Sequence, residues 1–361
     1  MIPTAYESGN ISSGKLGGYG KLTEIIRCEI NEELNGDYSL EFDYPVTGRF
    51  YDALKSSASI MIVGPTGKQE VFDVFKYSVP INGVVTFYCN HASRRLANYI
   101  LTGNLTVKTI GTNIASQVVP TMGGDGMSAG VSNSTGSQQT VILSAPASLL
   151  SALIGDGESL AAQGFEIVFS TSISAIDPNA HPGISVSVKT RRGADNGAVV
   201  RFGANMVDIE YITDETDTYN AFFPFWTDGN GGVIKPTGNA IAQPTTPITP
   251  IKAVPLDLTS VYQSQPTSAE MLTYATALLD ATTPWVLKKT ISCDLINGTD
   301  NELKGTKVEL GDTVHVYWSD ADISEDLRVV SYKYDVLAEK YMEIKLGTPT
   351  KNYVAITGIN D

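Results

Sequence analysis

The chain has 361 residues, enough for about two to four domains, and carries 25 Lys and Arg against 39 Asp and Glu, a net charge of −14. Such a chain offers few cations to a phosphate backbone, so we do not expect nucleic-acid binding. It has no run of about 18 apolar residues and no basic, then apolar, leader at its start, so we expect no membrane-spanning helix and synthesis in the cytoplasm.

The three cysteines, Cys28, Cys89 and Cys293, lie far apart and form no CxxC pair. Their number is odd, which argues against a disulfide framework or a structural zinc site. Cys89 alternates with Val85 and Phe87 in a strand-like run, so we expect it to be a small buried apolar residue.

The first hundred residues are typical of antiparallel strands. Residues 38–44 alternate apolar and polar side chains, and Asn35-Gly36 links them to the run 24–33 as a hairpin turn. Further strands are predicted at 60–63, 71–77 and 84–89. We therefore predict a first β-domain over residues 1–98, a small barrel or sandwich.

The last third repeats this plan of apolar strand, loop, long strand, turn and strand. Residues 314–318 alternate cleanly, and 327–334 with 341–346 predict a hairpin; 206–212 with 219–225 predict another. We assign a second, related β-domain to residues 199–226 plus 284–350, followed by a C-terminal tail at 351–361.

The segments between these domains have a different pattern. Residues 122–138 are rich in Gly and Ser, 147–163 carry a short helical pattern, and 167–169 and 184–188 predict strands. Residues 229–256 form a Pro-rich connector, and Thr267 and Glu270 make a capping box for a helix that ends before Thr283. We predict a mixed α/β middle domain from 99–198 plus 227–283, giving a mainly β (α+β) protein.

No catalytic constellation is present. The three histidines, His91, His181 and His315, lack partners at helical metal-ligand spacing, and no nucleophile elbow, Walker A loop or dinucleotide fingerprint occurs. The glycine clusters at 17–20 and 123–126 favour loops over ligand cradles. We therefore expect no catalytic residue, no cofactor and no metal.

Two carboxylate clusters and one aromatic run remain. Asp214, Glu215 and Asp217, and the group from Asp320 to Asp326, fall in predicted turns, where Asp is favoured for backbone reasons. The second group leaves open a weak Ca²⁺ site. The aromatic run favours a core position, with a subunit interface as the alternative, and consists of Phe222, Phe223, Phe225 and Trp226.

Several ordered stretches resemble the prophage tail-protein family, also called tail-associated lysin or prophage endopeptidase tail. They are residues 29–45 (EINEELNGDYSLEFDYP), 191–195 (RRGAD), 201–206 (RFGANM), 308–316 (VELGDTVHV), 328–337 (RVVSYKYDVL) and 344–347 (IKLG). The match covers roughly residues 24–350 in the right order. No single stretch is a catalytic signature, so the specificity lies in the ordered set.

The resemblance implies a hub fold similar to the baseplate hub of contractile-tailed phages. There, two similar β-domains per subunit alternate around a homotrimer, which presents six similar surfaces to a hexameric ring. For this chain it implies a structural tail-tip protein that closes the tail tube and docks to the distal tail protein hexamer. It would also support host-attachment or lytic modules, with contacts to tape-measure and receptor-binding proteins, in the virion tail tip.

Two alternatives remain open at this stage. Many members of the family carry peptidoglycan-hydrolase or carbohydrate-binding modules after the hub, whereas this chain ends at Asp361, so we do not transfer the endopeptidase activity. A short hub and a fragment of a longer protein are both compatible with the sequence.

Two rival functions are also kept. One is a peptidoglycan hydrolase using Asp320, Asp322 and Asp326, and the other is a carbohydrate-binding adhesin using Trp226, Trp285 and Trp318.

Overall fold

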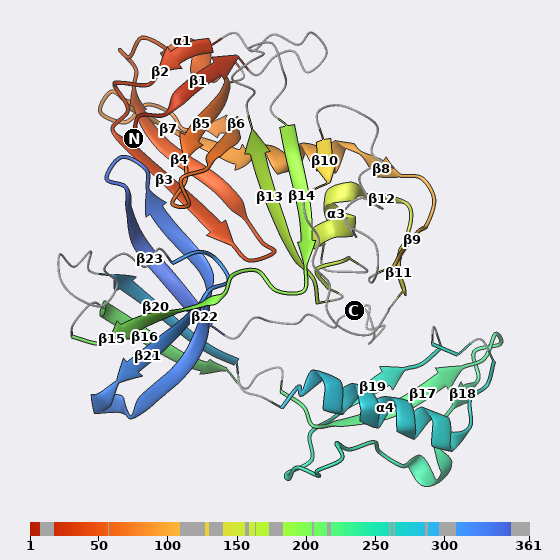
Figure 1. Cartoon of the computed structure of the whole chain (residues 1–361). Helices are drawn as coiled ribbons and strands as arrows, with labels where there is room; N and C mark the ends of the chain where they lie inside the picture. The colour runs from red at the N-terminus through yellow and green to blue at the C-terminus, as the bar shows by residue number, and fades with distance from the viewer. Residues whose placement is uncertain are drawn as a thin grey trace. The chain divides into compact units, whose positions relative to one another are not determined.

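The computed structural model describes residues 1–7, 18–56, 58–108, 127–129, 140–155, 159–162, 164–172, 183–203, 206–214, 218–259, 261–262, 264–285, 288–295 and 308–347. The chain is mainly β and divides into two compact units (Figure 1). Unit 1 comprises residues 1–210 and 291–349, and unit 2 comprises 211–290 with 350–361. Among the described residues, no helix is long and apolar enough to cross a membrane.

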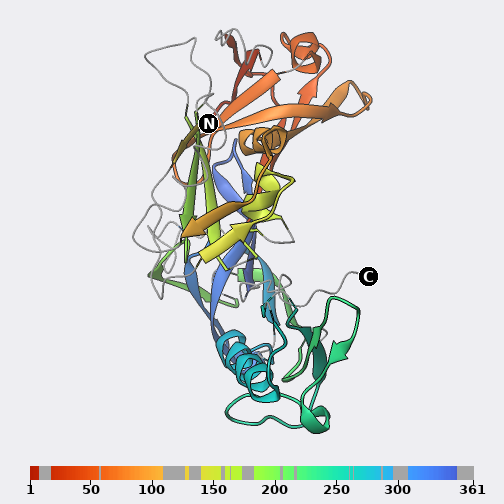
Figure 2. The ribbon, with the colours of Figure 1, turned by 90° about the vertical axis from the view of Figure 1, so that its right-hand side faces the viewer.

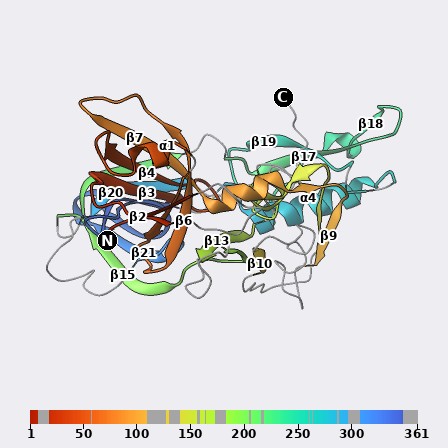
Figure 3. The same ribbon diagram turned by 90° about the horizontal axis from the view of Figure 1, so that it is seen from above.

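The first strand domain is an antiparallel array whose elements follow the expected alternation. Its elements are β1 (Thr4–Glu7), β2 (Gly18–Lys21), β3 (Arg27–Glu33), β4 (Tyr38–Pro45), α1 (Tyr51–Lys55), β5 (Ala58–Val63), β6 (Gln69–Tyr77) and β7 (Val84–His91). Asn35 has a positive φ of 56° in the β3–β4 turn, the conformation that Asn and Gly tolerate. The predicted hairpin and the three strands that follow it are confirmed, and Figure 3 shows β7, β4 and β3 as neighbours.

The second strand domain supplies the other half of the same sheet. Its elements are β15 (Asp195–Arg201), β16 (Met206–Asp214), β20 (Lys288–Leu295), β21 (Thr313–Trp318), the 3-10 turn η4 (Ser319–Ala321), β22 (Ile323–Asp335) and β23 (Lys340–Gly347). Strands β21, β22 and β23 are consecutive antiparallel neighbours, as are β5, β6 and β7 in the first domain. The strand order inferred for a repeated plan is therefore present in both domains.

The two strand domains are joined edge to edge. Strand β22 pairs with β3, with Ser331 opposite Glu33 and Asp335 opposite Glu29, and this pairing completes one 13-stranded sheet. The sequence predicts two related β-domains, and the structure adds that they share a continuous hydrogen-bonded sheet. Joining in this way satisfies the backbone groups of two strand edges that would otherwise be open.

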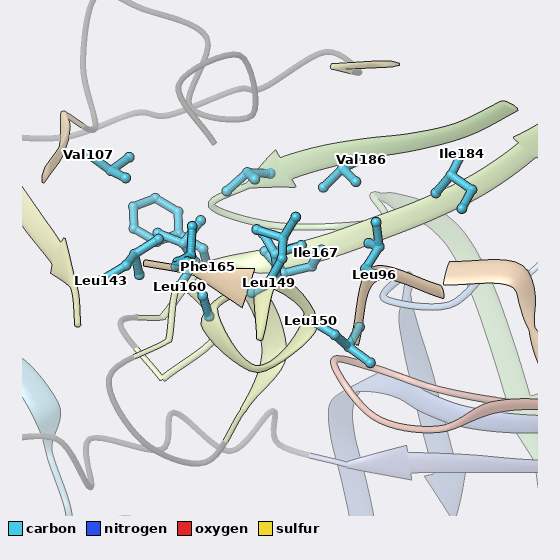
Figure 4. Packing of buried hydrophobic residues seen from close by; sticks show 14 residues of the cluster. Leu96, Val107, Leu143, Leu149, Leu150, Leu160, Phe165, Ile167, Ile184 and Val186 are labelled. Carbon is cyan, nitrogen blue, oxygen red and sulfur yellow. The ribbon is translucent and has the colours of Figure 1, made fainter. Parts of the chain in front are cut away.

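The middle domain lies between β7 and β15 in the sequence. Its elements are η1 (Ala92–Asn98), β8 (Ile100–Leu101), β9 (Leu105–Lys108), β10 (Met127–Ala129), β11 (Thr140–Leu143), β12 (Ala147–Ser148), α3 (Leu149–Ile154), β13 (Glu166–Ser172) and β14 (Gly183–Lys189). Figure 4 shows Leu149 and Leu150 of α3 among Leu96, Ile167 and Val186 in its apolar core. The predicted strands and the short helix are confirmed; the Gly/Ser-rich segment 122–138 lies almost wholly outside the described residues.

Unit 2 is a small α/β unit, with α4 and its strands drawn in Figure 2. It has its own apolar core. Its elements are β17 (Ala221–Thr227), β18 (Val233–Ile234), the 3-10 turn η3 (Thr237–Asn239), β19 (Ala253–Asp257) and α4 (Ser268–Thr282). The capping box is confirmed, with the Thr267 hydroxyl accepting from the Glu270 amide and the Glu270 carboxylate accepting from the Thr267 amide. Helix α4 ends at Thr282, before Thr283 and Pro284, as predicted.

This grouping differs from the domain boundaries expected from the sequence in two respects. Residues 227–283 do not join 99–198 in one middle domain, and residues 219–225 do not form a hairpin with 206–212. Strand β16 is a neighbour of β20, whereas β17 pairs with β18 and β19. The reason is packing: Phe222 of β17 shares a buried core with Leu256, Met271 and Leu279.

Candidate functional site: a charged junction in unit 1

The Glu32 carboxylate binds the segment after β14 and the second strand domain at once. Arg192 follows β14, and its guanidinium Nη1 lies 2.7 Å from Oε1 of Glu32 on β3. The hydroxyl of Tyr332 on β22 donates to the other oxygen of the same carboxylate. Burial acts to lower the pKa of Arg192, but the Glu32 carboxylate outweighs it, so this pKa lies above its ordinary value. Burial, reinforced by the charge of Glu32, raises the pKa of Tyr332 well above its usual range.

A second ion pair, beside the first, connects the middle domain to the second strand domain. Arg328 on β22 binds Glu166 on β13 in a bidentate manner, with Nη1–Oε1 2.7 Å and Nη2–Oε2 2.8 Å. The carbonyl oxygen of Arg192 accepts from Arg328 Nη2 at 2.8 Å, and the amide of Arg192 donates to Glu166. Charge-assisted, bidentate pairs of this kind are both strong and geometrically specific. We call the four residues Glu32, Arg192, Glu166 and Arg328 the charged junction.

Backbone packing fixes the segment that carries Arg192. Gly193 has φ +75°, and a Cβ there would come within 2.2 Å of the carbonyl carbon of Gly311, so only glycine fits. The Asp312 carboxylate accepts from the Ala194 amide at 2.7 Å and from the Glu309 amide at 2.9 Å. The stretch after β14 is therefore held backbone to backbone against the turn before β21.

Two further contacts fasten the middle domain to the first strand domain. The buried Glu70 carboxylate on β6 accepts from the amide and the hydroxyl of Thr171, both at 3.0 Å, and lies 3.1 Å from His91 Nε2. The side chain of Asn35, in the β3–β4 turn, bonds the carbonyl of Phe165 and the amide of Ile167, both at 2.8 Å. The three domains of unit 1 are thus connected by saturated polar contacts, an arrangement suited to rigidity.

The aromatic run of the sequence lies in unit 2. Phe222 is buried in the core beneath α4, and Trp226 packs against that core and donates from Nε1 to the Tyr262 carbonyl at 2.9 Å. Phe223 and Phe225 alternate with them, so they point to the opposite face of β17 and are half-buried. The core interpretation therefore holds for Phe222 and Trp226, and the interface prediction for Phe223 and Phe225 stays untested.

The acidic residues after β21 lie at an exposed turn. Asp320 and Asp322 are exposed, and Asp326 accepts from His315 Nδ1 at 2.6 Å, while His315 Nε2 lies 3.2 Å from Asp195. In the part of the chain that the structure describes, no group of three or more His, Cys, Asp or Glu is arranged to hold a metal ion. Glu215, Asp217 and His181 lie outside the described residues.

The remaining tryptophans and two of the cysteines pack against other side chains of the fold. Trp285 packs against the core of unit 2, and the ring centroid of Trp318 lies 4.9 Å from that of Phe202. Cys28 and Cys89 are free thiols in the core, and burial raises the pKa of each. The prediction of Cys89 as a buried apolar residue is confirmed.

Sequence reasoning did not find the charged junction. The stretches around Arg192 and Arg328 carry part of the family resemblance, but no spacing pattern links Glu166 to Arg328, which are 162 positions apart. The available signal was the pair Arg192-Gly193 in the segment after a strand, because glycine permits close approach of another backbone segment.

Comparison with solved structures identifies the fold. Over 99% of this chain and 97% of the other, it is similar to prophage tail protein gp18 of Listeria monocytogenes, with a TM-score of 0.58 and 15% identity. The tail protein of Neisseria meningitidis gives a TM-score of 0.54 and 11% identity, covering 98% of both chains. The 43 kDa tail protein of prophage MuSo2 of Shewanella oneidensis gives a TM-score of 0.53 and 10% identity, covering 98% of this chain and 99% of the other.

These similarities confirm the tail-protein fold that the sequence resemblance implies. The sequence itself matches no family model and no curated protein.

Proposed function

We propose that this chain is a structural protein of a phage tail tip. The observation that carries the proposal is the similarity to tail proteins from three bacteria, which covers nearly the whole of this chain and of each of the others. The charged junction supports a mechanical role, because its polar groups are satisfied by one another within the protein rather than directed toward a ligand.

In this role the protein closes the tail tube, docks to the ring of distal tail protein and supports host-attachment or lytic modules. A homotrimer with two strand domains in each subunit presents six similar domains, which match a sixfold ring without a symmetry clash. The consecutive three-strand arrays β5–β7 and β21–β23 supply the two comparable domains. A joint made rigid by buried ion pairs would keep the six surfaces at constant spacing.

The proposal assigns no enzymatic activity to the chain. A general acid of a glycosidase needs an apolar environment that raises its pKa, whereas Asp320, Asp322 and Asp326 lie at an exposed turn. Zymography on cell walls is expected to give no clearing. A cleared zone that disappears when these three residues are changed to Asn would favour the hydrolase instead.

The direct test is the mass of the purified chain by light scattering, at high concentration, alone and mixed with the distal tail protein. We expect a trimer, or a complex of three copies with a hexameric ring. A chain that stays monomeric in both samples contradicts the proposal and makes the adhesin the better hypothesis. A glycan array, with Trp→Ala variants at 226, 285 and 318, then tests that alternative.

A further inference from the structure

One end of the first strand domain carries an exposed apolar surface. Phe75, Tyr77, Val79 and Ile81 are 60%, 47%, 76% and 67% exposed, all within the β6–β7 hairpin. The pairing of β6 with β7 shifts between Val74 and Lys76, so Phe75 is the extra residue of a bulge. Bulges redirect side chains, and apolar residues gathered in this way mark an interaction site. We call residues 75–81 the apolar turn.

Cations lie beside the apolar turn, in a chain whose net charge is −14. The ammonium of Lys55 lies 5.9 Å from the ring centroid of Tyr77, and that of Lys76 lies 4.7 Å from the ring centroid of Tyr88. Lysines held over aromatic rings keep their charge at the surface while their stems cover apolar area. The surface therefore fits a partner that is both apolar and acidic.

The same chain carries a surface of that description. The segment 317–326 contains the end of β21, the turn and the start of β22, and in it Tyr317 is 42% exposed. Phe202, directly after the neighbouring strand β15, is equally exposed, and its ring packs against Trp318. Arg201 lies over the Tyr317 ring at 5.4 Å, but carboxylates outnumber it. We call this segment the acidic turn; its carboxylates belong to Asp320, Asp322, Glu325 and Asp326.

The register of the sheet keeps these two turns apart within one molecule. Strand β22 begins at Ile323, within the acidic turn, and ends at Asp335; its 13 residues span roughly 40 Å. Asp335 pairs with Glu29 on β3, and the pairing then passes through β4 to β7, where Pro45 lies opposite Val84 at the apolar turn. The two turns thus lie toward opposite ends of the sheet, and Figure 1 shows β21 and the lower end of β22 well away from β6 and β7.

We propose that the apolar turn of one copy packs against the acidic turn of a second copy. Because the two surfaces differ, the contact is head to tail, and repeating it closes a ring when the rotation permits. The proposal rests on the tail-tip assembly proposed above and names the surfaces that form it. A membrane is the less suitable occupant, since a chain of charge −14 is repelled by an anionic bilayer.

The test exchanges the charges of the two surfaces. Lys55→Glu with Lys76→Glu, and separately Asp320→Lys with Asp322→Lys, are expected to weaken association at least tenfold, as measured by light scattering over a concentration series. The variant that carries all four changes is expected to recover the association of the wild-type chain. Lys68→Glu with Lys235→Glu alters the net charge equally at exposed positions elsewhere and is expected to associate like the wild type.

The outcomes separate this contact from the proposed function. A wild-type trimer that persists in both two-site variants contradicts the contact and leaves the tail-tip proposal standing, and a four-site variant as weak as the others also contradicts it. A wild-type chain that remains monomeric, alone and with the ring protein, contradicts both proposals. A membrane role is tested by co-sedimentation with phosphatidylcholine/phosphatidylglycerol vesicles. If the wild type sediments with the vesicles and the double variant Val79→Ser with Ile81→Ser does not, while the variant still forms the trimer, the apolar turn binds a membrane and the proposed contact is wrong.

Discussion

Two regions of the molecule are held together by opposite means. The charged junction in unit 1 consists of ion pairs withdrawn from water, whereas unit 2 is organised by an apolar core around Phe222, Met271 and Leu279. Burial of apolar side chains stabilises a fold with little demand on geometry. A buried ion pair must first offset the loss of hydration, and it does so only when every donor and acceptor is placed. The junction therefore contributes fixed geometry, and the core of unit 2 contributes stability.

The largest effect should follow from breaking the junction. Changing Arg192→Ala leaves the Glu32 carboxylate buried without its cation, and we expect a loss of about 3–5 kcal/mol in the free energy of unfolding of unit 1. Chemical denaturation followed by circular dichroism measures it.

The neighbouring arginine provides the matched control for this substitution. Arg191 is bonded to Thr313 at the surface, so Arg191→Ala should change stability by less than about 0.5 kcal/mol. The double variant Glu32→Gln with Arg192→Met removes both charges and should be less destabilising than Arg192→Ala alone. Equal losses in the two arginine variants would contradict the junction as described.

The apolar core of unit 2 should respond to a cavity without affecting the junction. Leu279→Ala removes a fully buried side chain from the inner face of α4, with an expected cost of about 2–5 kcal/mol. Hydrogen exchange should become faster in α4 and β17 and stay unchanged in β3 and β22. Faster exchange in all four elements would mean that the two units unfold as one.

A smaller loss is expected at the start of α4. Thr267→Ala removes the hydroxyl that accepts from the Glu270 amide at 3.2 Å and should cost about 1 kcal/mol. Thr267→Ser retains the oxygen and serves as the control. The measurement is again amide exchange in α4, and exchange that is equally fast in both variants would count against the cap.

The smallest effect concerns pH at the surface of the second strand domain. The hydrogen bond to Asp326 and, after it, the charge of Asp195 raise the pKa of His315 above its ordinary value of 6.5. Its contribution to stability is therefore fully present below about pH 6.5 and is lost as the pH rises through the raised value. Denaturation midpoints from pH 5 to 9 should fall slightly more in the wild type than in His315→Gln; identical profiles would contradict this linkage.

Local patterns were enough to predict most strands and the capped helix. The alternation of residues 38–44, the Asn35-Gly36 turn and the Thr267–Glu270 box depend on neighbours in sequence, and the structure confirms each. These local patterns do not determine how the strands pair with one another. That is why the hairpin expected between 206–212 and 219–225 is absent and the aromatic β17 belongs to another core.

The charged junction was beyond such patterns for a related reason. The local sequence around a glutamate is the same whether its strand is exposed or the carboxylate binds a buried arginine. Glu32 meets Arg192, which follows β14, and Tyr332 of β22 only in the assembled fold. Contacts between residues 160 positions apart, such as Arg192 and Glu32, depend on the assembled fold as a whole.

The connection of unit 2 to the sheet has a consequence for protein engineering. The chain leaves the second strand domain after β16 and returns through β20, and these two strands are adjacent in the sheet. An insertion whose ends emerge side by side can be exchanged for another folded module, or for a short loop, without changing the register of the strands that carry it. We therefore expect that unit 2 can be replaced by another folded domain while the sheet that carries it is retained.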